Sequence, residues 1–405
     1  NGLEKRPKLR FPGFDEPWQT TLLSSVFAKN TQKNTDGRIT NVICNSAKQG
    51  LIPQREYFDK DIANSDNTNG YYIIEENDFV YNPRKSADAP YGPISSYKYT
   101  EAGIVSPLYL CFRAKKEINP AFFEWYFRSS AWHRYVYMSG DSGARHDRVS
   151  IKDDTFFAMP ISIPFAHEQA QIAIFLERIE QRIEMQRALV DNLKKYKRGL
   201  LSREFGQQEN GDLNNRYVGK LKDYFHLSSG STPSSTNRAF YSGNIRWVSS
   251  GELKPKYLCE TIQHISSEAV SSCNLREYPA NTLLVAMYGL EAAGVRGTAS
   301  ILSVPATISQ ACMAIQQTGE IDIEYLYYWY IYNGQWIGIR IAQGTKQQNL
   351  STDTLGNLRI HAPSCSKQKK VCKLLSQIDY LIEKEGQKID LLSSAKRGLL
   401  QQLFI

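Results

Sequence analysis

The chain has 405 residues, 41% of them hydrophobic, which is enough for two or three globular domains with ordinary cores. Its net charge of +8 favours an acidic partner such as nucleic acid, although charge alone does not single one out. The seven cysteines include no CxxC pair, and no apolar run approaches the ~20 residues of a membrane span. Composition therefore argues against a disulfide-stabilised secreted domain, and we expect a soluble cytoplasmic protein with no membrane partner.

An N-terminal arm is expected over residues 1–17, followed by a first globular domain over 18–165. Aromatic and β-branched runs broken by turn residues predict strands in this domain, at GYYIIEENDFVYNP and GIVSPLYLCF. A helix is expected over Pro120–Tyr137. The preceding Asn119-Pro120-Ala121-Phe122 partly matches the Asn-Pro-Pro-aromatic loop of DNA amino-methyltransferases, but proline suits the first turn of a helix, and we interpret it as the helix start.

A central conserved spacer helix is predicted over residues 166–216. Apolar residues recur there at alternating intervals of four and three, which predicts one long helix packed against another. These seam residues are Ile172, Leu176, Ile179, Ile183, Val190, Leu193 and Leu200, interrupted by Gln186 and Lys197.

A second globular domain over 217–364 and a C-terminal spacer helix over 365–405 repeat this layout. The stretch 365–404 matches 166–205 at thirteen of forty positions, at an offset of 199 residues. The seam recurs as Val371, Leu375, Ile378, Ile382, Ile389, Leu392 and Leu399, interrupted by Glu385 and Lys396. Runs such as NTLLVAMYGL and ATISQACMAIQ predict strands in the second domain, and a helix is expected over Ile323–Ile339.

The two domains are predicted to share a framework although most of their sequence differs. We align Leu22 with Leu221, and Val26 with Phe225, near the domain starts. The fold class is therefore α+β: two mixed globular domains with two long helices that pair antiparallel as an internal repeat. Each seam would be roughly 43 Å long at ~1.5 Å per residue, so the helices could act as a rigid spacer of about one turn of duplex DNA.

Basic and polar side chains collect in loops at corresponding places of both domains, before each spacer helix. Arg, Lys, Gln and Asn can read base edges, and neighbouring glycines let the backbone approach phosphate. The candidate DNA-binding residues are Arg84, Lys85, Arg145, His146, Arg148 and Lys152 in the first domain, and Tyr288, Arg296, Lys346, Gln347 and Gln348 in the second.

Signatures of catalysis are not found in the sequence. It contains no GxxxxGK[ST] phosphate loop, GxSxG elbow or HExxH helix, and its six histidines show no zinc-ligand spacing. We therefore expect no catalytic residues, metal or cofactor in this chain. Two alternatives stay open at this point: a diverged stand-alone DNA methyltransferase or nuclease, and a coiled-coil adaptor with no role on DNA.

Several motifs together resemble the specificity subunit of type I restriction–modification systems. They are LRFPGF at 9–14 with Trp18, SGSTPS at 229–234, WVSSGEL at 247–253, and Glu168-Gln169 and KRGLL of the long helix. Ser366-Lys367-Gln368 departs from the Pro-Glu-Gln that is usual where the second helix starts. The resemblance extends over nearly the whole chain, in the order of its parts.

This resemblance implies a non-catalytic subunit that recognises double-stranded DNA. Each globular domain would be a target recognition domain that reads one half of a bipartite target, and the helices would set the gap between the halves. The implied partners are two methyltransferase (modification) subunits and restriction/translocase subunits. S-adenosylmethionine, ATP and Mg would be bound by those partners.

Overall fold

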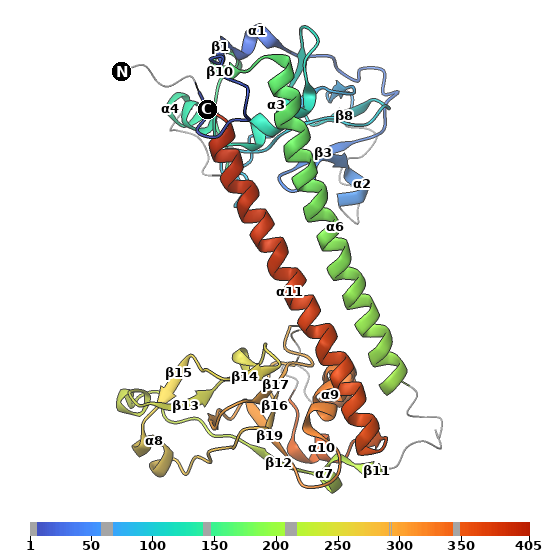
Figure 1. Cartoon of the computed structure of the whole chain (residues 1–405), viewed down its shortest axis with the longest axis vertical. Coiled ribbons are helices and arrows are strands. Elements are labelled where there is room, and N and C mark those ends of the chain that lie inside the picture. The colour runs from blue at the N-terminus through green and yellow to red at the C-terminus, as the bar shows by residue number, and fades with distance from the viewer. Residues whose placement is uncertain are drawn as a thin grey trace. The chain divides into compact units, whose positions relative to one another are not determined.

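The protein is described by a computed structural model over residues 6–57, 68–140, 147–206, 217–290, 292, 294–342 and 349–405. The chain divides into two compact units (Figure 1). Unit 1 comprises residues 1–187 and 387–405, and unit 2 comprises residues 188–386. Within the described ranges, no helix is both long enough and apolar enough to cross a bilayer.

The first domain, from β1 to β10, is built on an antiparallel sheet in the order β2-β9-β6-β7. Its strands are β1 (Gln19–Leu22), β2 (Phe27–Lys29), β3 (Ile43–Ser46), β4 (Gly50–Pro53), β5 (Tyr72–Ile74), β6 (Phe79–Tyr81), β7 (Ile94–Ser96), β8 (Gly103–Val105), β9 (Leu110–Ala114) and β10 (Pro160–Ile163). Its helices are α1 (Leu23–Val26), α2 (Gln54–Tyr57), α3 (Pro120–Arg128), α4 (His133–Ser139) and α5 (Asp153–Phe157). Strand β1 pairs with β10, and two further strand pairs, β3 with β4 and β5 with β8, complete the domain.

The second domain, from β11 to β20, contains a sheet in the order β12-β19-β16-β17-β14 and a smaller sheet β15-β13-β18. Its strands are β11 (Tyr217–Lys220), β12 (Phe225–Ser229), β13 (Ile245–Val248), β14 (Tyr257–Leu258), β15 (Gln263–Ile265), β16 (Leu283–Ala286), β17 (Ala299–Leu302), β18 (Thr307–Ile308), β19 (Cys312–Gln317) and β20 (Arg359–Ala362). Its helices are α7 (Leu221–Tyr224), α8 (Ser267–Ser272), α9 (Ile323–Trp336) and α10 (Thr352–Gly356), with 3₁₀ turns η2 (Arg238–Tyr241) and η3 (Ser250–Glu252) and a π-helical turn η4 (Ile337–Ile341).

The two central sheets have the same topology. The order β12-β19-β16-β17 repeats β2-β9-β6-β7 strand for strand, and the antiparallel pairings also match. The helix after the fourth of these strands in sequence packs on the third strand in both domains, α3 against β7 and α9 against β17. The duplication expected from the long helices therefore extends into the domains, where the sequences are mostly unlike.

The alignment of Leu22 with Leu221 is wrong by one residue. The amide of Leu23 donates to Met159 O (2.8 Å), and the amide of Leu221 donates to Leu358 O (3.0 Å), so these two leucines occupy the same place. Both are buried, whereas Leu22 is 47% exposed. By the same shift, Phe27 at the start of β2 matches Phe225 at the start of β12.

The helix expected over Pro120–Tyr137 is broken into α3 and α4. After α3, the Ser129 hydroxyl donates to Tyr126 O (2.6 Å), and the indole of Trp132 donates to Phe127 O (2.8 Å). These side-chain bonds satisfy carbonyls that a continuous helix would use. The predicted helix start is confirmed, because Asn119 Oδ1 accepts the Phe122 amide (3.0 Å) and Pro120 is in the first turn.

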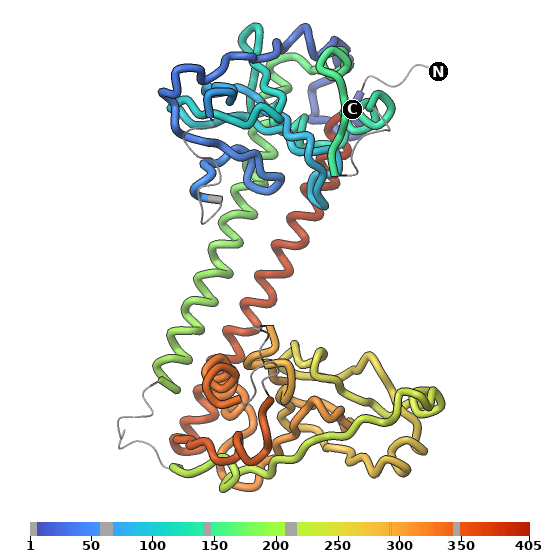
Figure 2. Tube along the Cα trace, turned by 180° about the vertical axis from the view of Figure 1, so that it is seen from behind, coloured from blue at the N-terminus to red at the C-terminus, as the bar shows by residue number. Residues whose placement is uncertain are grey.

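The long helices are α6 (Ala166–Phe205) and α11 (Cys365–Leu403). Every predicted apolar seam residue is buried or half-buried, and the polar Gln186 is buried as well. In each unit, the first half of one helix lies beside the last half of the other, so the pair is antiparallel (Figures 1 and 2). The predicted coiled-coil pair is confirmed.

Two ion pairs join the helices. In unit 2 Lys197 of α6 donates to Asp379 of α11, and in unit 1 Lys396 of α11 donates to Glu180 of α6. Each pair is the other shifted by 199 residues, so the polar breaks at the two lysines are contacts of the repeat. Each ammonium also lies near an aromatic ring of the adjacent domain, 5.6 Å from the ring centroid of Tyr328 and 6.0 Å from that of Trp125.

The end of each long helix completes the core of the domain on which the other helix begins. Phe404 lies against Trp18, Phe122 and Tyr126 in unit 1, at ring-centroid distances of 5.7–6.5 Å. In unit 2 Phe205, its counterpart in the repeat, packs edge-on against a tyrosine of α9 at 5.1 Å. The Phe that follows each KRGLL is therefore a core residue.

The N-terminal arm is attached to both long helices in unit 1. Arg10 forms a two-pronged ion pair with Glu168 near the start of α6, with both N–O distances 2.7 Å. Glu168 is almost fully buried and also accepts from the Trp18 indole (3.4 Å). The amide of Leu9 donates to Gln402 O of α11 (3.0 Å). The arm thus satisfies a carbonyl at the end of α11 while holding the start of α6.

Phe404→Ala is expected to destabilise unit 1. Loss of a buried aromatic ring costs about 3–5 kcal/mol, and Phe404 is 5% exposed among three other rings. Hydrogen exchange should show lost protection over 399–405 and in α3. Leu391→Ala, on α11 but 70% exposed, is the matched control and should leave exchange unchanged. Equal effects of the two substitutions would contradict this account of the core.

Glu124→Gln should remove part of the acid sensitivity of unit 1. Burial tends to raise the pKa of Glu124, but Arg128 (2.6 Å), Lys98 and hydrogen bonds from Ser96 outweigh it and hold this pKa below the usual 4.5. A lowered pKa stabilises the fold above about pH 4.5, and the contribution is lost as pH falls through the folded-state value. Urea unfolding at pH 7 should show a loss of about 1–3 kcal/mol in the variant. The loss should shrink below pH 4; a loss independent of pH would contradict the prediction.

Candidate nucleic-acid interface

Two basic segments predicted in the first domain are joined by backbone hydrogen bonds. The amide of Val149 donates to Pro83 O (2.8 Å), and the amide of Lys85 donates to Asp147 O (2.9 Å). Arg84 and Arg148 are bridge partners between these hydrogen bonds. Segments some sixty residues apart are thereby joined, and their cations lie at one edge of the domain.

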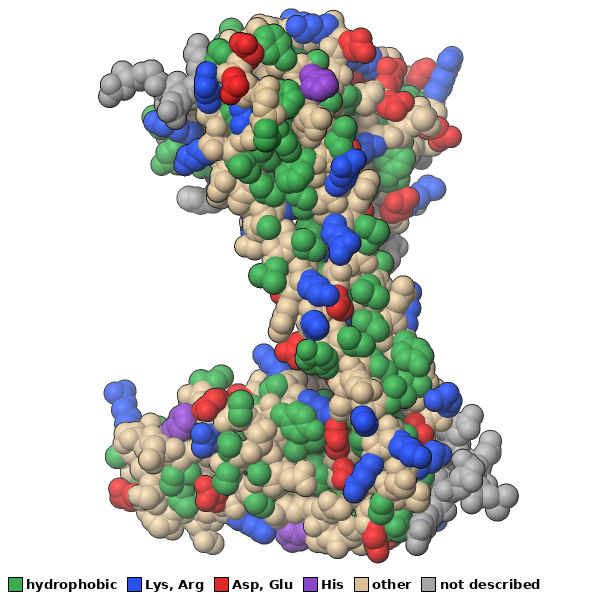
Figure 3. Space-filling view, in the orientation of Figure 1, with side chains coloured by type: hydrophobic (Ala, Val, Ile, Leu, Met, Phe, Trp, Pro, Cys, Tyr) green, Lys and Arg blue, Asp and Glu red, His purple; other side chains and the backbone are tan. Residues whose placement is uncertain are grey.

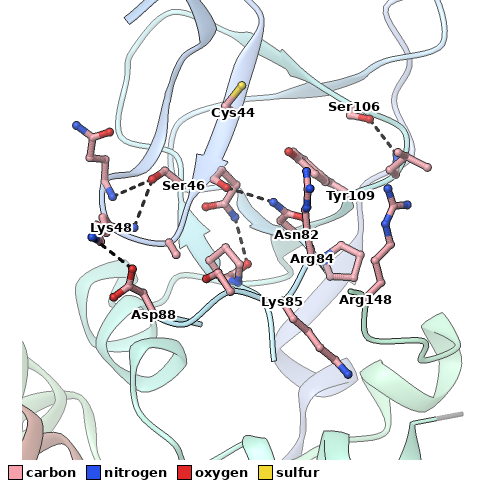
Figure 4. A pocket seen from close by; sticks show the side chains of 17 residues that line it. Cys44, Ser46, Lys48, Asn82, Arg84, Lys85, Asp88, Ser106, Tyr109 and Arg148 are labelled. Carbon is pink, nitrogen blue, oxygen red and sulfur yellow. Dashed lines mark hydrogen bonds and ion pairs between the residues drawn. The ribbon is translucent and has the colours of Figure 1, made fainter. Parts of the chain in front are cut away.

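A hollow of about 860 Å³ opens beside this pairing (Figure 4). It is lined by Cys44–Gln49, Asn82–Ser86, Asp88, Pro93, Ser106, Leu108, Tyr109 and Arg148. The side chains of Arg84 and Arg148 extend the same way, with Tyr109 beside Arg84, whereas Lys85 extends in the opposite direction (Figure 4). Lys48, from the β3–β4 turn, pairs with Asp88 at 3.5 Å.

The asparagines of the hollow support its shape. Asn45 donates to Val80 O (2.7 Å) and Pro93 O (3.2 Å), and Asn82 donates to Asn45 O (3.2 Å) while accepting the Arg84 amide (3.1 Å). Gly92 has φ +82°, and a Cβ there would lie 2.2 Å from Asn82 O, so only glycine closes this loop. The asparagine side chains are thus engaged by backbone, whereas Arg84 and Arg148 line the hollow.

Arg148 has an unsatisfied nitrogen beside the hollow. Its Nε is buried with no hydrogen-bond partner among the residues described, and it forms only a long ion pair with Asp147 (3.9 Å). Burial raises the pKa of the nearby Tyr109 phenol, so that hydroxyl stays protonated at neutral pH and can donate. Guanidinium groups with a donor hydroxyl beside them suit an anionic ligand such as phosphate.

The second domain repeats one hydrogen bond of this loop pairing. The amide of Leu350 donates to Met287 O (2.8 Å), as the amide of Val149 does to Pro83 O. The residue after each accepting carbonyl is Arg84 in the first domain and Tyr288 in the second. The tyrosine is 42% exposed. The two loops that the sequence matched between the domains therefore occupy equivalent places.

The remaining predicted residues fall in different settings. Arg145, His146, Lys346, Gln347 and Gln348 lie outside the described residues. Lys152 is exposed at the start of α5 but does not line the hollow.

Arg296 supports the loop that begins at Tyr288. Its Nε donates to Leu290 O (2.7 Å), and its side-chain stem lies against Gly338. This geometry makes it an internal support of the loop.

Lys48 and Tyr109 were missed by the sequence reasoning. Both come from turns outside the two basic stretches and join them only in the folded domain. Gly50, with φ +72°, gave a signal for Lys48, because a glycine directly after SAKQ marks a tight turn that projects its side chains.

A cluster of metal-binding residue types occurs in unit 2, where ligand atoms of Asp322, Glu324 and Cys372 lie within 4.8 Å of one another. Glu324 is already bound by Lys256 and by the Ser376 hydroxyl (2.5 Å). The Lys256 ammonium occupies the place of a cation beside that carboxylate. The cluster therefore connects the second domain to α11.

The long helices also expose apolar side chains outside the seam. They are Ile174, Met185, Leu189 and Tyr196 on α6, and Leu374, Tyr380, Leu381 and Leu391 on α11, each 39–70% exposed. Figure 3 shows hydrophobic side chains reaching the surface along the helices. Such rows of exposed apolar residues are typical of protein–protein contact.

Comparisons with known proteins find similarity to type I DNA specificity proteins. Residues 215–393 match the family model described as type I restriction modification DNA specificity domain. The type I restriction enzyme MjaIX specificity subunit of Methanocaldococcus jannaschii is 29% identical over 192 residues, 46% of this chain and 43% of that protein. The chain thus matches less than half the length of this relative.

Solved structures share the fold over the full length. A chain from a structural study of complex assembly and conformational transition of the type I R-M system has a TM-score of 0.63 at 16% identity, covering 98% of this chain and 99% of that one. The type I restriction–modification S subunit from M. genitalium has a TM-score of 0.57 at 15% identity, covering 99% of each chain. With the family match over the second domain and the same sheet built twice, the chain is similar to the specificity subunits of type I restriction–modification systems.

Proposed function

We propose that this chain recognises a bipartite target in double-stranded DNA, with each globular domain reading one half. One observation carries the proposal: the same sheet and the same loop pairing are built twice, with unlike side chains at equivalent loop positions. A repeated frame with different loop residues suits two readers of different sequences. Recognition of two identical half-sites would instead require similar side chains in the loops of both domains.

Phosphate contact is assigned to the cations of the first domain. Arg84 and Arg148 extend together at the hollow (Figure 4). An Arg148 nitrogen buried without a partner is unfavourable in the free protein, and a phosphate oxygen would supply an acceptor for its hydrogen bond. The flanking amides of Asn45 and Asn82 are used internally, so direct base reading falls to other side chains of the loops.

The long helices are assigned two further tasks. As a continuous antiparallel pair, they set the gap between the two half-sites. Their exposed apolar side chains would dock two methyltransferase subunits, one at each copy of the repeat. In this assignment the chain is not an enzyme, and restriction/translocase subunits complete the assembly. S-adenosylmethionine, ATP and Mg would act on those partners.

Replacement of one domain tests the bipartite assignment. Residues 217–364 are exchanged for the corresponding domain of another specificity subunit, and the chimera is expressed with its methyltransferase subunits in a methylation-free host. Sequencing of the methylated bases should show one half of the target changed, with the other half and the gap retained. The reciprocal exchange of residues 18–165 is the control and should change the other half. A target that stays whole, or changes in both halves, would refute the assignment.

Neutralising the cations of the hollow should lower the salt dependence of DNA binding. Each phosphate contact contributes a slope of about −0.9 in log K against log salt concentration. Arg84→Ala and Arg148→Ala should therefore each make the slope less negative by about 0.9, measured by fluorescence anisotropy from 50 to 200 mM salt. Arg38→Ala, an exposed arginine paired with Asp36 away from the hollow, should leave the slope unchanged. An unaltered slope in the first two variants would remove the phosphate role.

A further inference from the structure

The two domains present different chemistry at one equivalent position. Pro83 O accepts the Val149 amide, and Met287 O accepts the Leu350 amide, both at 2.8 Å. The next residue is Arg84 in the first domain and Tyr288 in the second. A guanidinium contacts phosphate or guanine as a cation, whereas a phenol carries no charge and offers a ring and one hydroxyl.

The loop that carries Tyr288 is held in place from within. Gly289 has φ +77°, which lets the chain turn directly after the tyrosine. Arg296 returns to donate to Leu290 O (2.7 Å). Gly297, with φ +73°, lies so close to Gly334 of α9 that a Cβ on Gly334 would be 2.1 Å from the Gly297 Cα. The loop is therefore fixed to α9.

The tyrosine remains available on this fixed loop. Its side chain is 42% exposed while the neighbouring Met287 and Leu290 are buried in the domain core. An aromatic side chain has few rotatable bonds, so it loses little conformational entropy when it makes a contact. A positioned, exposed ring at the site where the first domain places a guanidinium is suited to specific contact.

We propose that Tyr288 is a specificity-determining residue of the second domain, contacting base edges of its half-site through its ring. This rests on the proposed function. At this position the first domain then makes a charged contact through Arg84, and the second domain makes an uncharged contact through Tyr288. Apolar contact with a base edge, such as the thymine methyl, discriminates bases without releasing counterions.

Salt titration separates the two kinds of contact. The full chain is assembled with its methyltransferase subunits, and affinity for the target duplex is measured from 50 to 200 mM salt. Tyr288→Ala should weaken binding roughly 10-fold at every salt concentration, with an unchanged slope. Tyr288→Arg should make the slope more negative by about 0.9, and Arg84→Ala, the matched control, should make it less negative by about 0.9. Tyr288→Phe keeps the ring and should bind within about 3-fold of wild type.

The half-site supplies the second readout. The loss in Tyr288→Ala should disappear on duplexes whose second half-site is scrambled and persist when the first is scrambled. Three results for Tyr288→Ala would each overturn the inference: full affinity, a salt slope that differs from wild type, or loss of methyltransferase subunits as seen by mass photometry. In those cases sequence-specific binding by the wild-type complex would leave the proposed function standing. A wild-type complex without any preferred sequence would overturn both.

Discussion

The exchange of helix ends between the two domains is the constraint on which the rest of the structure depends. Lys197 and Asp379 in unit 2, and Lys396 and Glu180 in unit 1, are one ion pair made twice, 199 residues apart. Each pair joins an early part of one helix to a late part of the other, and each lysine also faces a ring of the domain beside it. A half-buried ion pair contributes modest stability, but an unpaired lysine in an apolar seam is unfavourable. The pairs therefore favour the antiparallel register in which both domains receive a helix end.

The domains combine a fixed frame with changeable loops. The sheet order and the first turn after β1 and β11 recur in both, with Leu23 and Leu221 in the same place. Backbone hydrogen bonds define these features, and they tolerate different side chains provided that the apolar pattern persists. At the loop pair, the backbone contact recurs while the side chains change from cationic to aromatic. One framework can thus be reused for different ligands without rebuilding the core.

Sequence reasoning was strongest where structure depends on periodicity. The seam of α6 and α11 repeats over many turns, so both helices and their apolar face could be predicted. The exact placement of single residues within the domains could not be predicted. Leu22 was aligned in place of Leu23, because tertiary hydrogen bonds decide where a four-residue helix begins. The break before α4 depends on Trp132 reaching a carbonyl five residues back. At the candidate interface, the composition of the basic loops indicated where cations collect, but Lys48 and Tyr109 join them only through folding.

The docking of Phe404 also affects how the protein is made. Leu400, Leu403 and Phe404 belong to the core of the first domain, although that domain's own strands are translated first. About 240 residues separate the end of β10 from Leu400, which at ~5–20 residues per second takes roughly 12–48 s on the ribosome. During that interval the ring pocket of the first domain lacks the residues that fill it. The second domain has no such delay, because Phe205 precedes it. The nascent first domain therefore exposes part of its apolar core until residues 400–404 are synthesised, and exposed surface of this kind is prone to aggregation.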